Sequence, residues 1–298
     1  MRTRQFALQS GWYCPIVVGV TLAAFMLTVF GISILAGLVG SLLGLGGGII
    51  VVPGLTLLMG VDIRYAIGAS IVSVIATSSG AGAAYIRDRL VNIRVSMFLE
   101  LATTSGALGG AFLAGVVGGR WLYLIFAVAM AYTAAAMWRH DESKRPPASR
   151  VDAWADTLAL HGSYPEQTAG EEIGYRVSRS RLGFGLSGVA GVLSGLLGIG
   201  GGIIKVPTMT LGMGIPMKVA TASSNFMIGV TAAASAGVYF ARGDVNPFIA
   251  GPTALGVLVG SLLGTRLMRR IESRALRAAF TAVLIITAVQ MAIKGARL

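Results

Sequence analysis

The sequence is poor in cysteine, histidine and charged residues, and each shortage excludes a class of protein. Cys14 is the single cysteine of 298 residues, so no internal disulfide can form. The two histidines, His140 and His161, lie in the same polar stretch, and the sequence shows no metal-ligand cluster, nucleophile motif or pair of intramembrane aspartates. We therefore expect no catalytic residue, no metal and no cofactor, and the chain is not expected to be an enzyme.

Charged residues make up only 12% of the chain, whereas soluble proteins contain about 25%. Hydrophobic residues make up 55%, and the length allows roughly ten helices of about 20 residues and one loop domain. The composition therefore indicates an all-α integral membrane protein. The Lys and Arg residues behind the net charge of +12 lie mostly at the ends of apolar runs, where they would face anionic lipid headgroups. Membrane lipid is thus an expected partner and nucleic acid is not.

Ten apolar segments can be drawn, five before and five after a polar stretch rich in Pro, Asp, Glu and Arg. We therefore divide the chain into a first transmembrane repeat (1–138), a cytoplasmic central loop (139–181) and a second transmembrane repeat (182–298). The apolar segments cover about 16–45, 48–60, 64–86, 94–118, 120–138, 182–199, 202–213, 218–240, 246–265 and 275–293.

The two halves repeat each other at a constant spacing of 154 residues. Between 37–53 and 191–207, 11 of 17 positions are identical, and the same spacing relates Tyr85 to Tyr239. A chance likeness between two sets of apolar helices would not keep one register over so long a stretch. Internal repeats of this kind are the usual build of secondary transporters.

Arginine and lysine cluster in three loops, which indicates how the repeats lie in the membrane. The clusters follow the third apolar segment, fill the central loop and follow the ninth segment. All three can lie in the cytoplasm if each half crosses the membrane five times, and the two repeats are then inverted. However, 48–60 and 202–213 fall short of a crossing, because about 12 residues span about 18 Å of a core of roughly 30 Å. These two segments could instead be half-helices or re-entrant.

Each half contains three consecutive glycines: the first glycine triplet is Gly46, Gly47 and Gly48, and the second is Gly200, Gly201 and Gly202. The triplets should interrupt helices, because each glycine disfavours a helix by about 1 kcal/mol relative to alanine. A new helix is expected directly after each triplet, with Pro53 and Pro207 near its first turn. The free N–H groups of two such helix starts, brought together by a pseudo-two-fold axis, would bind an anion in mid-membrane. The alternative is that the glycines serve only tight helix packing.

Lys205 differs from its counterpart in the first repeat, Val51. A lysine deep in a membrane segment is costly and is by default a functional candidate, here as a direct partner for an anionic substrate. The alternative is that its long side chain carries the ammonium group to the membrane interface.

Three other polar residues are candidates for the same site, and a fourth is a candidate for proton coupling. Ser70, Ser224 and Asn225 lie early in the third apolar segment of each half, and the repeat relates Ser70 to Ser224. Their hydroxyl and amide groups could donate hydrogen bonds to an oxyanion or could simply bond between helices. Glu100 lies several residues inside the fourth segment and could carry a coupling proton or lie at the interface.

The doubled pattern Gly-x-Gly-Gly-Gly-x-x-x-x-Pro at 44–53 and 198–207 resembles the sulfite exporter TauE/SafE family of membrane permeases. The polar runs that follow the pattern and the turns Val91-Asn92 and Val245-Asn246 are also similar to that family. The resemblance implies a multi-pass protein of the bacterial inner membrane that transports sulfite, sulfoacetate or related organosulfonates. Lys205 departs from the apolar form of the repeat, so the resemblance implies no role for it.

These observations predict two inverted repeats of about five helical segments each, with short or broken helices after the triplets. The favoured function is a secondary transporter for sulfur-containing anions, with alternating access to a mid-membrane site and a coupling proton as a further partner. A passive anion channel with the same site is the alternative, and a scaffold whose glycines serve packing alone is a third. A homo-oligomer is compatible with the sequence, and no ATP-binding motif is visible.

Overall fold

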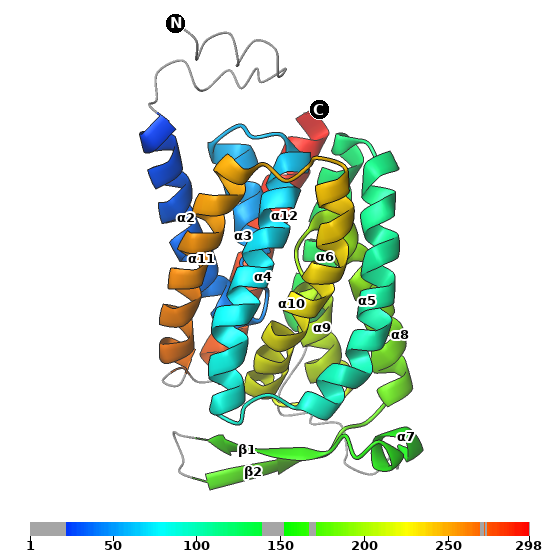
Figure 1. Ribbon diagram of the computed structural model, residues 1–298. Coiled ribbons are helices and arrows are strands. Elements are labelled where there is room, and N and C mark those ends of the chain that lie inside the picture. Colours follow the sequence, from blue (N-terminus) through cyan, green and yellow to red (C-terminus); the bar gives the residue numbers. More distant parts are fainter. Residues whose placement is uncertain (1–21, 139–151, 167–170, 269–270, 272, 298) are drawn as a thin grey trace, which may run out of the picture.

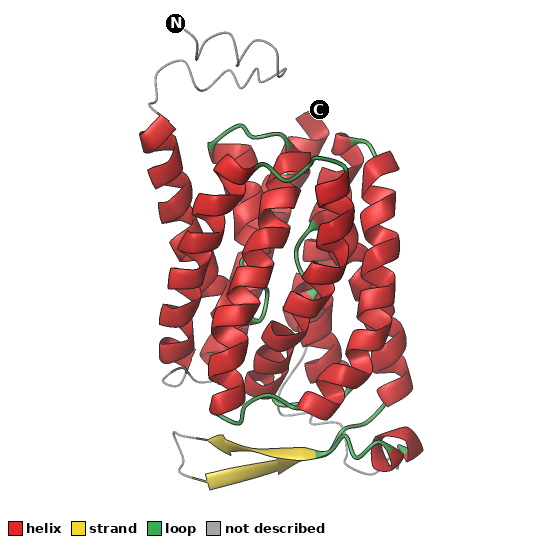
Figure 2. Cartoon of the chain, in the orientation of Figure 1, coloured by secondary structure: helices red, strands yellow, loops and turns green. Residues whose placement is uncertain are grey.

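The computed structural model describes residues 22–138, 152–166, 171–268, 271 and 273–297 (Figures 1 and 2). Cys14, His140 and the predicted helix start at residue 16 lie outside the described residues. The first half contains α2 (Leu22–Leu43), α3 (Gly48–Pro53), the π-helix η1 (Gly54–Leu58), α4 (Ile63–Arg87), α5 (Ile93–Val116) and α6 (Gly119–Trp138). The central segment contains α7 (Ala153–Thr157), β1 (Gly162–Glu166) and β2 (Glu171–Tyr175). The second half contains α8 (Ser180–Leu197), α9 (Gly202–Pro207), the π-helix η2 (Thr208–Gly212), α10 (Met217–Ala241), α11 (Pro247–Met268) and α12 (Ser273–Arg297).

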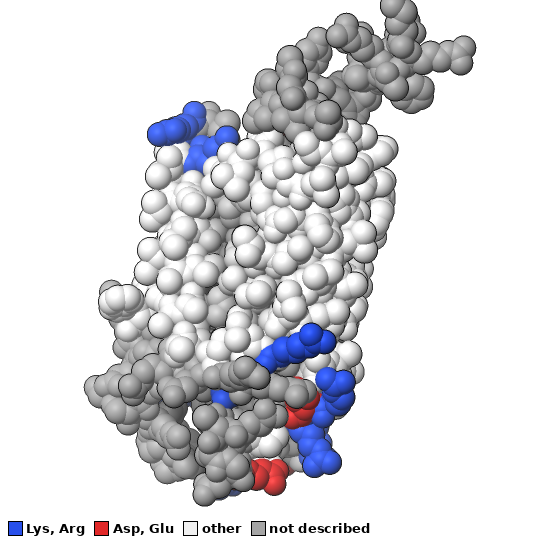
Figure 3. Space-filling model, turned by 90° about the vertical axis from the view of Figure 1, so that its left-hand side faces the viewer, with Lys and Arg blue, Asp and Glu red and all other residues white. Residues whose placement is uncertain are grey.

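Six of the described helices are long and apolar enough to cross a membrane: α2, α4, α5, α8, α11 and the Ala278–Arg297 part of α12. Helices suit this environment because all their backbone hydrogen bonds can be made within one segment. On the face shown in Figure 3, the charged side chains lie near the two ends of the molecule and the middle is uncharged. The predicted all-α integral membrane fold is confirmed.

The two halves build matching sets of helices. Residues Ile63–Arg87 of α4 and Met217–Ala241 of α10 are related by the same spacing of 154 as the sequence repeat. The packing also matches, because α2 packs on α11 where its counterpart α8 packs on α5, and α4 packs on α10. In Figure 1, α2 begins at the end of the bundle that holds the C-terminus, and α8 begins at the opposite end, beside the strands.

Two buried tyrosines make equivalent hydrogen bonds in the two halves. The Tyr85 hydroxyl donates to the Ser41 carbonyl oxygen at 3.0 Å, and the Tyr239 hydroxyl donates to the Gly195 carbonyl oxygen at 2.7 Å. Ser41 and Gly195 are themselves related by the repeat spacing. Each bond ties the third helix of a half to the end of the helix that precedes the glycine triplet.

Replacing either tyrosine by phenylalanine should therefore have the same effect. Tyr85→Phe and Tyr239→Phe are each expected to lower the free energy of unfolding by about 1 kcal/mol, because each removes the hydrogen bond between a buried hydroxyl group and the backbone of the helix that precedes the glycine triplet. Thermal unfolding in detergent measures both losses. A clear loss in one variant and none in the other would show that the two bonds are not equivalent.

The short helices after the triplets are half-helices. Gly48–Leu58 and Gly202–Gly212 each combine an α-helical and a π-helical part, and 11 residues span only about 16 Å. Figure 2 shows the loops that contain the triplets inside the bundle, away from both of its ends. Each half-helix therefore runs from the interior of the bundle toward one end and does not cross it.

The predicted position of the prolines was wrong. Pro53 and Pro207 are the last α-helical residues of α3 and α9 and do not lie in the first turn. A proline inside a helix lacks its own N–H group and crowds the carbonyl group four residues earlier. The backbone continues as the π-helices η1 and η2 directly after the prolines, and this wider winding accommodates the missing hydrogen bond.

The central segment folds locally and docks on one end of the bundle. Its strands form an antiparallel hairpin in which Gly162 pairs with Tyr175. The Asn92 side-chain amide, at the start of α5, donates to the Leu160 carbonyl oxygen and to the Tyr175 hydroxyl, both at 2.9 Å. Burial raises the pKa of the Asp152 carboxyl, but hydrogen bonds from the start of α8 and from α7 outweigh burial and hold this pKa below its ordinary value.

Candidate functional site

The two glycine triplets meet inside the bundle. A Cβ atom built on Gly202 would collide with the Gly44 carbonyl oxygen, and one built on Gly48 would lie 3.0 Å from the Gly198 carbonyl oxygen. Each triplet therefore lies against the residues that flank the other triplet. The two triplets thus come together at one place, where each packs against the other half of the chain.

Glycine is needed in the triplets for a conformational reason as well. Gly47 caps the start of α3 with φ of 72°, and Gly201 caps the start of α9 with φ of 74°, both in the left-handed region. Residues with a side chain rarely adopt this backbone conformation, whereas glycine adopts it without strain. The half-helices begin at the next residue, so their first N–H groups, which have no partner within a helix, lie at the place where the halves meet.

The side chains of Ser70, Ser224 and Asn225, which the sequence predicted to bind the anion, lie beside the glycine triplets. The Ser70 hydroxyl donates to the Gly198 carbonyl oxygen at 2.6 Å, and the Ser224 hydroxyl donates to the Gly44 carbonyl oxygen at 2.7 Å. The Asn225 amide donates to the Ser41 carbonyl oxygen at 2.6 Å, and its buried Oδ1 has no hydrogen-bond partner among the described residues. In this conformation the donors thus bind backbone between helices, which is the structural role that the sequence left open.

Sequence reasoning missed two branched side chains that lie against both triplets. A Cβ atom on Gly46 would lie 2.6 Å from Ile228 and 3.2 Å from Val74, and one on Gly200 would lie 2.9 Å from Val74 and 3.0 Å from Ile228. Val74 comes from α4 and Ile228 from α10, and the two are themselves 154 residues apart. The repeat spacing, applied to apolar positions as well as polar ones, would have found them.

Lys205 and Glu100 form a buried ion pair, which the sequence did not predict. The Lys205 Nζ donates to Glu100 Oε2 at 3.3 Å and to the Thr231 hydroxyl oxygen at 2.9 Å. The hydroxyl groups of Thr231 and Thr104 donate to Glu100 Oε1 at 2.6 and 2.9 Å. The Lys205 side chain is fully buried and that of Glu100 is 9% exposed, so both charged groups end inside the protein and against each other.

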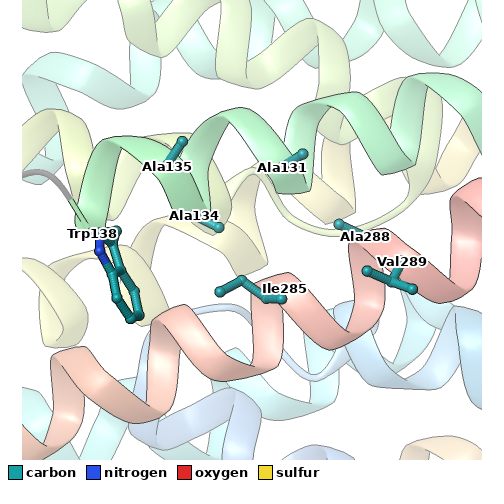
Figure 4. A pocket seen from close by; sticks show the side chains of 7 residues that line it. All are labelled: Ala131, Ala134, Ala135, Trp138, Ile285, Ala288 and Val289. Carbon is teal, nitrogen blue, oxygen red and sulfur yellow. The ribbon is translucent and has the colours of Figure 1, made fainter.

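A shallow apolar groove lies elsewhere, between α6 and α12. It is lined mainly by alanines together with Trp138, Ile285 and Val289, as Figure 4 shows. None of the predicted site residues lines this groove, and it offers no charged group. The candidate site is therefore the meeting point of the triplets with the neighbouring ion pair.

The fold and this arrangement define a class of protein: a multi-pass helical membrane transporter with broken helices at the centre of the bundle. The family model described as Sulfite exporter TauE/SafE matches residues 29–291. The chain therefore belongs to the TauE/SafE sulfite exporter family. Its membrane-spanning helices and its bacterial relatives make it a multi-pass protein of the inner membrane.

Three relatives illustrate the likeness. The chain is 29% identical over 271 residues to the Probable membrane transporter protein YunE of Bacillus subtilis, covering 89% of this chain and 96% of the relative. It is 30% identical over 245 residues to a Probable membrane transporter protein of Xylella fastidiosa, covering 80% and 84%. It is 32% identical over 119 residues to Sulfite exporter TauE/SafE family protein 1 of Arabidopsis thaliana, covering 40% and 26%. No solved structure matches the chain.

Proposed function

We propose that this chain is a secondary transporter for sulfur-containing anions such as sulfite, sulfoacetate or other organosulfonates. Membership of a family described as sulfite exporters supports the substrate class. The buried lysine and the two half-helix starts favour an anion over a cation. No catalytic role is proposed, because transport needs only groups that bind the anion and release it.

The single observation that carries the proposal is the contact between the triplets of opposite halves. The halves hold each other by equivalent interactions, Ser70 with Gly198 and Ser224 with Gly44. We propose that they are inverted repeats related by a pseudo-two-fold axis. Because the two halves make equivalent contacts, they could rock against each other between two related states, one open to each side of the membrane. Alternating access requires two such states.

In this proposal the conformation described here is closed. The serine and asparagine donors are bound to backbone, and Val74 and Ile228 lie against the triplets. Separation of the halves would free these donors and the first N–H groups of α3 and α9. An oxyanion between the triplets would then accept hydrogen bonds from both halves, and its charge would be favoured by both helix starts and by Lys205.

We also propose that the end of the bundle with the central segment faces the cytoplasm. In Figure 1 the α4–α5 turn, the described part of the central segment, the end of α11 and the start of α12 all lie at that end, and both described termini lie at the other. The arginines in these three regions favour the cytoplasmic side.

Uptake of labelled sulfite and labelled sulfoacetate into proteoliposomes tests the proposed function. We expect uptake that saturates with concentration and is accelerated when the vesicles are preloaded with the unlabelled anion. Protein-free vesicles and vesicles preloaded with chloride are the controls. Large unitary currents without saturation would mean a passive channel. Absence of saturable uptake for every sulfur oxyanion tried would refute transport of this substrate class.

A further inference from the structure

The ion pair breaks the symmetry of the site. Lys205, Glu100 and Thr231 correspond by the repeat spacing to Val51, Ala254 and Thr77, so these equivalent positions carry no charged residue. Thr77 donates to the Gly46 carbonyl oxygen at 3.2 Å and so holds the first triplet. Its counterpart Thr231 instead donates to Glu100. The Thr231 hydroxyl group therefore donates to the Glu100 carboxylate and not to the second triplet, where the comparison with Thr77 would place it.

The pair also connects the two halves. Glu100 lies on α5 of the first half, whereas Lys205 lies on α9 and Thr231 on α10 of the second half. Lys205 is three residues past the second triplet, and its own backbone N–H donates to the Gly201 carbonyl oxygen at 3.1 Å. Any separation of the halves that moves α9 away from α5 would therefore separate the ammonium group from the carboxylate.

The contacts of Glu100 fit a carboxylate. Its two oxygens accept hydrogen bonds from the hydroxyl groups of Thr104 and Thr231 and from the Lys205 ammonium group. Of the three ammonium hydrogens, the described part of the chain offers acceptors to two. Like a carboxylate, a sulfonate or sulfite group is an anion whose oxygens accept hydrogen bonds from an ammonium group.

We propose that Glu100 is a built-in anion that occupies Lys205 until the sulfur oxyanion takes its place, and that Glu100 then takes up a proton. The substrate oxygens replace the carboxylate oxygens on the ammonium group, which stays protonated. The displaced carboxylate loses its cation inside the protein, where an unpaired charge is costly, and binds one proton from the aqueous side that is open. This inference rests on the proposed function and adds that each anion moves together with about one proton.

The other described cations on α5 and on the helices that pack on it lie at the ends of those helices. Of the elements that pack on α5, α10 carries Lys218 in its first turn, with Arg242 after its last residue, and α8 carries Arg181 in its first turn. Arg181 lies over the Trp154 ring, and Arg242 pairs with Asp244 and lies over the Tyr239 ring. On α5 itself, Arg94 binds the Ala159 carbonyl oxygen. Lys205 is the cation that the structure places against Glu100.

Proton uptake on binding tests the inference with the unmodified protein. Sulfoacetate is a suitable probe because its groups stay ionised between about pH 6 and 8. Calorimetric titration of the purified protein in two buffers of different ionisation enthalpy measures the protons taken up. We expect about one proton per sulfoacetate bound near pH 7. Binding without proton uptake would overturn the inference and leave the proposed function intact, whereas absence of binding and of uptake for all sulfur anions would overturn both.

Three variants separate a competing anion from a merely structural ion pair. Glu100→Gln removes the competitor, so sulfoacetate should bind several-fold more tightly, stabilise the variant more than the wild type, and be taken up independently of a proton gradient. Glu100→Gln combined with Lys205→Met removes both charges and should fold without binding the anion. Asp244→Asn, which breaks the separate Arg242–Asp244 pair, should keep the proton dependence of the wild type. Wild-type affinity and gradient dependence in Glu100→Gln, or wild-type binding in the double variant, would refute the proposal.

Discussion

Replacing Gly202 by alanine is expected to abolish transport and to destabilise the protein by about 3 kcal/mol, at the upper end of what one added methyl group usually costs. The added Cβ would collide with the Gly44 carbonyl oxygen and lie 3.0 Å from the Leu45 Cα atom. Both atoms belong to the backbone of the other half, so no side-chain rotation relieves the collision. The two halves would have to move apart at the point where their triplets meet. Thermal unfolding in detergent and sulfite uptake measure the two effects.

Two other glycines provide a graded comparison. The Cβ atom of Gly48→Ala would first meet the Ser70 hydroxyl oxygen, which can rotate away, and would then lie 3.0 Å from the Gly198 carbonyl oxygen, so a smaller loss is expected. Gly237, also inside a helix, has no atom within 4 Å of such a Cβ, and Gly237→Ala should leave stability and transport unchanged. If Gly202→Ala behaved like Gly237→Ala, the close contact between the halves would not exist.

Replacing Lys205 by methionine should cost about 3–5 kcal/mol, because it leaves the Glu100 carboxylate buried without its cation. Glu100→Gln should cost a similar amount for the opposite reason, since it leaves the ammonium group unpaired. The double variant should recover most of the loss, because buried ion pairs contribute little beyond apolar or neutral side chains of the same volume. A double-mutant cycle of unfolding free energies in detergent measures this coupling.

Val51 is the matched control for this prediction. It occupies the position equivalent to Lys205 and is buried to the same degree, with 1% of its surface exposed. Val51→Met changes the volume but no charge, and should cost less than about 1.5 kcal/mol. A Lys205→Met variant that is no less stable than Val51→Met would show that Lys205 and Glu100 are not paired in the folded protein.

The repeat and the glycine triplets could be recognised in the sequence because neither depends on how the helices pack. Three consecutive glycines break a helix wherever they occur, and a constant spacing of 154 shows that whatever forms around Gly46–Gly48 also forms around Gly200–Gly202. The short length of the two half-helices could also be predicted, because the apolar segments 48–60 and 202–213 are both too short to cross a membrane. The placement of Pro53 and Pro207 could not be read in this way, because it depended on the residue at which the helix would start.

The partners of the polar side chains could not be predicted. Lys205 and Glu100 are 105 residues apart, and Ser70 and Gly198 are 128 residues apart, so only the packing of α5, α9 and α10 and of the two triplets brings them together. The sequence suggested that Lys205 and Ser70 could face an anion and that Glu100 could carry a proton, but the structure pairs each of these side chains with another part of the protein. The same packing brings Val74 and Ile228 against the triplets, and no polar signal marks them.

The order of residues by itself determined that this protein lies in a membrane, that its helices come in two related sets and that each set is interrupted at three glycines, because hydropathy, spacing and glycine content act along the chain. Only the tertiary structure decided that the second half holds a lysine against a glutamate of the first. A buried charge must find its counter-charge wherever the fold brings one within reach, and that distance is set by helix packing and not by position in the chain.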